Sequence, residues 1–133
     1  MTKRLLGLSG LFLLGCLGFL GCASNATLVS VPRGDWGGHN ADLAVTDAGA
    51  TAQFKCGAVG QVVQRLSLDG SGRFTATGTY DPRLVQGGPR PATFSGSVSG
   101  SHLQLSIQTA DGTVGPFDLV MGQAASFDVC NFS

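Results

Sequence analysis

Strict alternation of apolar and polar residues constrains the fold of this chain more than any other feature. In the stretch 102–109, the odd positions from Leu103 to Ile107 are apolar and the even positions are His, Gln or Ser. The stretches 73–80 and 92–98 repeat this pattern, with threonine and serine at most of the polar positions. Such alternation sends side chains to opposite faces of a β-strand, and no stretch after residue 30 sustains the helical period of 3.6. The sequence therefore predicts an all-β domain whose strands each have one solvent-exposed face.

Turn-forming residues separate the alternating stretches at intervals of roughly eight to twelve residues. Asp, Gly and Ser in such turns provide positive φ angles and local hydrogen bonds. We expect Asp47, Asp69 and Asp111 to cap these turns, and sequential strands to pair antiparallel. The clearest turns are TDAG at 46–49, LDGSG at 68–72, SGS at 99–101 and ADGT at 110–113.

Eight strands are predicted between and beside these turns. Short strands with one apolar face can bury those faces and remove exposed sheet edges by closing into a barrel. We expect a small antiparallel up-and-down barrel, with a compact sandwich as the alternative, and Phe127 and Val129 of the last strand facing inward. The predicted strands are 41–45, 50–56, 62–68, 73–80, 92–98, 102–109, 114–120 and 125–132.

Trp36 is the only tryptophan and stands before two glycines. A lone Trp beside glycines is more often a core plug than the wall of a ligand pocket, so we expect its indole inside the barrel. Counted along one strand, Trp36 is out of phase with Leu43 and Val45. Trp36 can point inward together with Leu43 and Val45 only if the chain bulges between them. This predicts a bulge at Gly37 and Gly38.

The first 21 residues differ in composition from the rest of the chain. Lys3 and Arg4 give a positively charged start, and no charged residue occurs from Leu5 to Gly21, where Leu, Phe and Gly dominate. This run falls short of the ~20 apolar residues that a membrane-spanning helix needs, and its glycines weaken it further as a helix. Residues 1–21 are therefore predicted to be a cleaved export signal.

The sequence Phe19 to Gly21 before Cys22 resembles a bacterial lipobox, in which a small residue before the cysteine lets a signal peptidase cut there. The resemblance implies that the Cys22 thiol carries acyl chains such as palmitate, which together anchor a protein stably. Leu-Leu-Gly before Cys16 also fits the pattern, so Cys16 is the alternative acylation site. Residues 22–32 are expected to form the lipidated N-terminus and linker, and residues 33–133 a single domain. This predicts an exported, lipid-anchored protein, on the periplasmic face of the outer membrane in a bacterium with two membranes.

Cys56 and Cys130 are the only cysteines after residue 22. Because an exported compartment is oxidising, this pair predicts a disulfide bond. On the chain-entropy model, a disulfide that closes the long loop between these two residues stabilises the folded protein by ~4 kcal/mol. Cys130 is out of phase with the inward residues predicted before it, so the bond requires either a second bulge or a position at a strand end.

The charge pattern argues against several function classes. After residue 21 the chain has six basic residues and eight aspartates, which give a formal charge of −2. These charged residues do not cluster in the sequence. There is no basic stripe to bind nucleic acid. The chain has no Glu and no Gly-x-Ser-x-Gly motif, so we expect no enzymatic activity. His39 and His102 are far apart in sequence, and we expect neither a metal site nor a cofactor.

Six sequence features of the mature chain occur in a fixed order. They are Trp-Gly-Gly at 36–38, a Gly turn at 46–49, Cys56, Leu-Asp-x-x-Gly-Arg-Phe at 68–74, Gly-Gly-Pro at 87–89 and Cys130. In these features the chain resembles a family of uncharacterised bacterial secreted proteins and lipoproteins. The histidine that the family commonly has two residues after Gly-Gly is Asn40 here. The resemblance supports the β fold and the disulfide and implies no activity.

Two function classes remain. The first is a non-enzymatic binding or inhibitor-like module that takes a small apolar ligand or blocks an envelope protein, by analogy with small lipoprotein barrels that inhibit lysozyme. The second is a passive structural or interaction protein of the envelope. Inward-facing Gly78 and Gly96 indicate either space for a ligand or tight closure, and the irregular stretch 81–91 is where binding specificity is expected. The candidate binding surface comprises Trp36, His39, Arg83, Gly87, Gly88 and Pro89.

Overall fold

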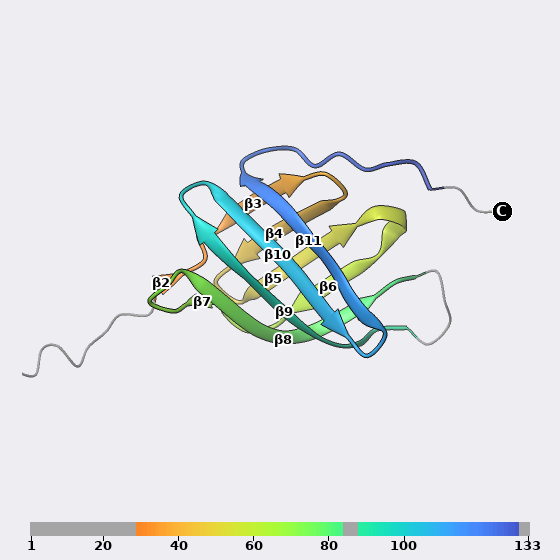
Figure 1. Ribbon diagram of the computed structural model, residues 1–133, viewed down its shortest axis with the longest axis horizontal. Coiled ribbons are helices and arrows are strands. Elements are labelled where there is room, and N and C mark those ends of the chain that lie inside the picture. The colour runs from red at the N-terminus through yellow and green to blue at the C-terminus, as the bar shows by residue number, and fades with distance from the viewer. Residues whose placement is uncertain (1–28, 84–87, 131–133) are drawn as a thin grey trace, which may run out of the picture.

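The computed structural model describes residues 29–83 and 88–130, which form an all-β domain (Figure 1). The predicted signal segment with Cys16 and Cys22 lies outside the described residues, as do Gly87 and residues 131–133. Within the described residues, no helix has the length and apolar character needed to cross a membrane.

Eight strands form a closed antiparallel barrel in which successive barrel strands are neighbours. The first and last of them close the ring by pairing Trp36–Gly38 with Leu119–Met121. This confirms the predicted fold class and selects the barrel over the sandwich. The strands are β3 (Gly34–Gly38), β4 (Ala41–Thr46), β5 (Gly49–Phe54), β6 (Val59–Val62), β8 (Arg73–Asp81), β9 (Arg90–Ser99), β10 (His102–Thr109) and β11 (Gly112–Met121).

A separate two-stranded sheet lies where the chain enters the barrel. It pairs β2 (Val29–Ser30) with β7 (Ser67–Leu68). Val31 follows β2 and is 1% exposed, and its N–H donates to the Leu66 carbonyl oxygen at 2.9 Å. Residues 29–32, which the sequence places in the linker, therefore pack as part of the folded domain.

The number of barrel strands is as predicted, but two of the predicted strands are wrong. The stretch 62–68 is divided between β6 and β7, and residues 125–130 contain no strand beyond one isolated bridge at Ser126. The eighth strand is instead β3, whose three glycines conceal any alternation. With β3 in the ring, residues 125–130 lie outside the barrel, and Phe127 and Val129 are exposed instead of facing inward.

The predicted bulge at Gly37 and Gly38 is also wrong. Trp36 lies directly opposite Leu43 across the hairpin of β3 and β4, without a register shift. Asn40 has a φ of 65° and lets the chain reverse between these strands. Because residues paired across a hairpin share a face, an even position and an odd position both point inward here.

Trp36 is a core plug, as expected. Its side chain is fully buried, and the indole N–H donates to the Pro32 carbonyl oxygen at 3.1 Å. The hydrogen bond satisfies the one polar group of the ring, so the large apolar surface is buried without an unpaired donor.

Aromatic rings fill the positions beside the inward glycines. A Cβ added at Gly96 would lie 2.9 Å from a ring carbon of Phe74, and one at Gly78 would lie 3.1 Å from a ring carbon of Phe94. The small residues therefore allow tight closure of the barrel and do not leave room for a ligand. The large side chains of the interior are all at most 5% exposed: Phe54, Phe74, Phe94, Leu103, Leu105 and Ile107.

Asp69 caps its turn as the sequence predicts. Its Oδ1 accepts hydrogen bonds from the N–H groups of Arg73 at 3.0 Å and Ser71 at 2.8 Å. The bond from Arg73, followed by those from Ser71, lowers the pKa of this carboxyl. The turn at 68–72 therefore depends on an ionised aspartate.

Threonine caps the two tight hairpins in place of the expected aspartates. Thr46 Oγ1 accepts from the Ala48 N–H at 3.2 Å, and Thr109 Oγ1 accepts from the Asp111 N–H at 3.1 Å. The aspartates of these turns pair with arginines on neighbouring segments, Asp47 with Arg33 and Asp111 with Arg90.

Candidate functional site at the distal end of the barrel

The up-and-down order assigns each connection to one of two ends of the barrel. The chain enters at Val29, and we call this the proximal end. It includes the connections 47–48, 63–72 and 100–101. The opposite, distal end consists of the connections 39–40, 55–58 and 110–111 and the one that begins at Pro82 and ends at Pro89.

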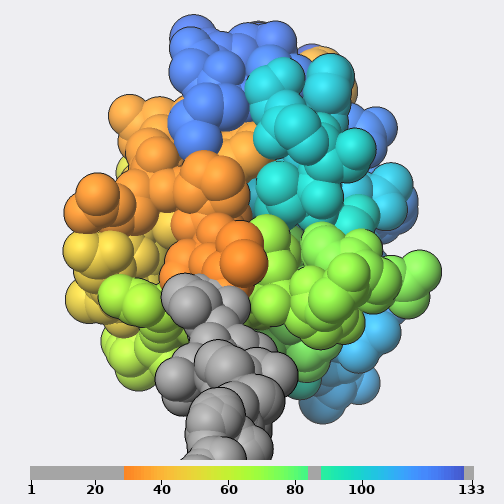
Figure 2. All heavy atoms as spheres, turned by 90° about the vertical axis from the view of Figure 1, so that its left-hand side faces the viewer, coloured from red at the N-terminus to blue at the C-terminus, as the bar shows by residue number. Residues whose placement is uncertain are grey.

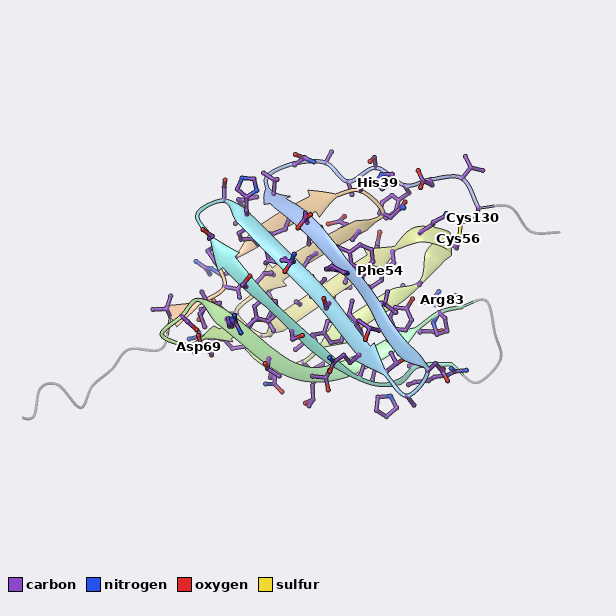
Figure 3. All side chains as sticks on the ribbon, in the orientation of Figure 1. His39, Phe54, Cys56, Asp69, Arg83 and Cys130 are labelled. Atoms are coloured by element: carbon purple, nitrogen blue, oxygen red, sulfur yellow. A yellow bond between two sulfur atoms is a disulfide. The ribbon has the colours of Figure 1, made fainter. Side chains whose placement is uncertain are left out.

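Four of the six predicted surface residues lie in connections at the distal end. His39, Arg83, Gly88 and Pro89 all belong to its connections. Figure 3 shows Arg83 on the same side of the barrel as the two cysteines, with Asp69 at the opposite end. Trp36 is instead in the core, and Gly87 lies outside the described residues.

The predicted disulfide joins Cys56 and Cys130, whose Cα atoms are 5.6 Å apart (Figure 3). Cys56 lies beyond the end of β5 in the short 3₁₀ turn η4 (Lys55–Gly57), with a φ of 67°. The bond is therefore at a strand end, the second of the two placements that the sequence left open. Because disulfides persist mainly in oxidising compartments, the pair is in keeping with an oxidising, extracytoplasmic environment.

The segment Gly122–Cys130, which we call the C-terminal tail, runs outside the barrel along β3 and ends at the disulfide (Figure 1). A Cβ at Gly37 would lie only 2.1 Å from the Gln123 carbonyl oxygen. The Trp-Gly-Gly motif thus has two functions in the fold. Its Trp fills the interior, and its first Gly leaves the outer face bare so that the tail backbone can approach.

Polar contacts hold the middle of the tail to the turn between β3 and β4. Ser126 donates its N–H to the Gly38 carbonyl oxygen at 3.0 Å and accepts at its own carbonyl oxygen from the Asn40 N–H at 2.7 Å. Asn40 Nδ2 donates to Asp128 Oδ2 at 3.0 Å, and Asn40 Oδ1 accepts from the Asp128 N–H at 2.8 Å. Asn40 therefore bonds the tail at two residues.

Asp128 provides the negatively charged group of this contact. The hydrogen bond from Asn40 has the largest effect and lowers the pKa of its carboxyl. Burial opposes it, and the charges of His39 and Lys55 lower the pKa further. His39 Nε2 lies 3.1 Å from Asp128 Oδ2. All of these groups are at the distal end, so the tail contributes to the same surface as the predicted residues.

Two grooves lie at the distal end. One has a volume of about 370 Å³ and lies between η4 and the tail. The other has a volume of about 270 Å³ and lies between the start of β9 and the turn joining β10 to β11. Phe54 closes the barrel beneath them, with its ring centroid 5.2 Å from Phe117 and 5.6 Å from Tyr80. Burial raises the pKa of the Tyr80 phenol. The first groove is lined by Gln53, Phe54, Cys56, Gly57, Ala58, Val59 and Phe127.

Sequence reasoning missed the exposed apolar residues of the tail. Phe127 is 44% exposed and Val129 is 82% exposed, although large apolar side chains at the end of a small domain are usually buried. They alternate with polar residues as the residues of a strand do. They lie outside the interior because the eight strands of the barrel close the ring without the C-terminal tail. They add an apolar element to the distal surface.

We expect Gly37→Ala to detach the tail from β3 without unfolding the barrel. The new Cβ overlaps the Gln123 carbonyl oxygen, whereas the barrel interior is unchanged because position 37 faces outward. The measurement is amide hydrogen exchange, with faster exchange expected at Asn40 and Ser126 and unchanged exchange in β10. Gly57→Ala is the matched control, since a Cβ there meets nothing within 4 Å, although its φ of 81° carries a local cost. Equal protection of Ser126 in the Gly37 variant and the parent would contradict this account.

Acid should loosen the same contact. Folding lowers the pKa of Asp128 from its ordinary value of 3.8, so its ionised form stabilises the attached tail above that value, and this contribution is lost as the pH falls through the lower folded pKa. Protection factors at Asn40 and Asp128 should therefore fall below about pH 4 while those in β10 persist. In Asp128→Asn, protection at Asn40 should no longer depend on pH in this range. An acid loss of the same size in this variant would assign the effect to another group.

Among the described residues, no three His, Cys, Asp or Glu side chains gather closely enough to hold a metal ion. No protein-family model, curated protein or solved structure matches the chain.

Proposed function

We propose that this protein is an exported lipoprotein, anchored through Cys22, whose barrel is a non-enzymatic binding module that presents its distal end to an envelope protein. The observation that carries the proposal is the placement of the disulfide, four of the predicted binding residues and the exposed tail side chains at the end opposite the point of chain entry. An anchor on the N-terminal side leaves that end free for a partner.

The filled interior favours a protein partner over a small apolar ligand. Phe74 and Phe94 cover the inward glycines, and Phe54 closes the distal end beneath the grooves. A barrel that binds small ligands inside keeps its interior open. Contacts are therefore expected through loops and the tail, as in inhibitors that insert surface residues into a partner.

Charge in the tail favours a basic partner. Asp128 lies between the exposed residues Phe127 and Val129, and its lowered pKa keeps the carboxyl ionised. An apolar patch beside this carboxylate suits a partner with exposed apolar residues and a positive rim. Mutating the rim should change the association rate, and mutating Phe127 should change the dissociation rate.

Site-specific photocrosslinking in living cells tests the binding surface. A photoreactive side chain is placed at Arg83 or Val129 of the full-length chain, and at Val63 as the proximal control, because Val63 is 88% exposed. We expect one discrete protein adduct from the two distal positions and none from Val63. Phe127→Ser should reduce the adduct formed from position 83, since it removes an apolar contact without touching the crosslinking residue.

The alternative of a passive envelope protein makes a different prediction. It requires either no adduct from any position or the same mixture of adducts from all three. If Phe127→Ser leaves the adduct from Arg83 unchanged, the tail is not part of the binding surface. An adduct from Val63 alone would place the partner at the other end.

Cys22→Ser tests the anchor. The variant should no longer incorporate labelled palmitate, because no other group in the mature chain would carry the acyl chains. Cys16→Ser is the matched control and should still incorporate the label. Loss of the label in Cys16→Ser, with labelling of Cys22→Ser, would transfer acylation to the alternative site.

A further inference from the structure

The proximal end of the barrel carries exposed apolar residues that the proposed binding surface does not use. Val29 is 61% exposed and Val63 is 88% exposed. They are two of the four large apolar side chains exposed among residues 29–83 and 88–130, and the other two belong to the C-terminal tail. Val29 lies in β2, and Val63 follows the last residue of β6, so both are at the proximal end.

Arginines accompany these valines. Arg33 and Arg65 both approach Asp47, at 3.0 and 3.9 Å, and their side chains are 68% and 55% exposed. In Figure 2, which faces this end, the segments that carry them surround the point at which the chain enters. Long exposed arginine side chains beside exposed valines can bind anionic oxygens while the valines enter an apolar layer.

The proximal end has no net formal charge. Its entry segment and connections hold two arginines, Arg33 and Arg65, and two aspartates, Asp47 and Asp69. The excess of aspartates over basic residues lies elsewhere in the molecule, so the proximal end has no net negative charge that an anionic surface would repel.

The proposed anchor limits how far this end can move from a bilayer. Six residues separate Cys22 from Val29, and a fully extended chain spans at most ~3.6 Å per residue, or about 25 Å over this stretch. A tether of this length gives the attached surface an effective concentration on the order of millimolar. Even a weak contact between the proximal end and the bilayer is therefore populated.

We infer that the proximal end rests on the phospholipid bilayer, with Val29 and Val63 at the level of the headgroups and Arg33 and Arg65 bound to lipid phosphates. The inference rests on the proposed anchor at Cys22. It fixes the orientation of the barrel: the membrane holds one end, and the distal surface projects away from it. The lipid is thus both the attachment point and a second contact of the folded domain.

Depth-dependent fluorescence quenching tests this orientation in the acylated full-length protein. Val63→Cys and, as the distal control, Arg83→Cys each receive an environment-sensitive fluorophore, and the protein is reconstituted into phosphatidylethanolamine and phosphatidylglycerol vesicles containing spin-labelled lipid. We expect several-fold stronger quenching and a blue-shifted emission at position 63. Arg33→Glu with Arg65→Glu should reduce the quenching at position 63 and leave that at position 83 unchanged.

Intact mass spectrometry of the same samples separates the two claims. An acylated protein with equal quenching at the two positions, or with stronger quenching at Arg83, overturns the inference and leaves the anchor intact. A protein without acyl chains overturns the anchor, and with it the orientation that depends on it. Acylation together with preferential quenching at position 63, weakened by the arginine substitutions, is the result that the inference requires.

Discussion

Replacing Trp36 by alanine is expected to cost about 3–5 kcal/mol of folding free energy. The indole is the largest fully buried side chain, and it lies opposite Leu43 where β3 closes the ring with β11. A natural domain has only about 5–15 kcal/mol of stability in total. Removing this side chain should therefore leave a large fraction of the protein unfolded at moderate urea concentrations.

Urea unfolding followed by far-ultraviolet circular dichroism measures this loss, because the substitution also removes the only tryptophan. Val63→Ala is the control. Its side chain is 88% exposed, so its effect should be within about 0.5 kcal/mol. Trp36→Phe should lie between the two, since it keeps an aromatic ring in the core but leaves part of the volume empty. A loss below about 1 kcal/mol for Trp36→Ala would show that the plug does not hold the ring closed.

Replacing both cysteines by serine is expected to destabilise the protein by about 4 kcal/mol on the chain-entropy model. The bond joins residues separated by 74 positions, so in the unfolded chain it restricts most of the domain. The folded barrel should persist, because no core side chain changes and the tail keeps its hydrogen bonds at Asn40.

Urea titrations with and without reductant separate the bond from the serine side chains. The reduced parent and the Cys56→Ser, Cys130→Ser variant should unfold at the same urea concentration, well below the oxidised parent. Their slopes should also be steeper, since an uncrosslinked chain exposes more surface on unfolding. Identical midpoints for the oxidised and reduced parent would show that the bond only fixes the tail locally.

Local pattern predicted the elements whose faces differ most. Strands β8, β9 and β10 alternate cleanly because one face fills the core with Phe74, Phe94 and Leu105 while the other meets water. The disulfide could be predicted because the signal-like N-terminus indicates an oxidising compartment, in which an even number of thiols pair. These properties belong to single strands or to cysteine number, and they do not depend on how the strands are arranged.

Features that depend on the whole ring could not be predicted from the sequence. Gly34–Gly38 shows no alternation, and it is a strand because two neighbours supply its hydrogen bonds. Phe127 and Val129 do alternate, yet they lie outside because the ring is already complete without them. The distal site was predicted in part from the irregular stretch after Asp81. Its contact with the tail and its position opposite the point of chain entry follow only from the order of the strands.

Intact mass spectrometry of the protein purified from membranes tests the central claim most directly. An exported, lipid-anchored barrel should have a chain that begins at an acylated Cys22 and a mass two hydrogens lower than that of the reduced form, from the bond between Cys56 and Cys130. A chain that retains residues 1–21, carries no acyl groups and has both of those cysteines reduced would contradict the account.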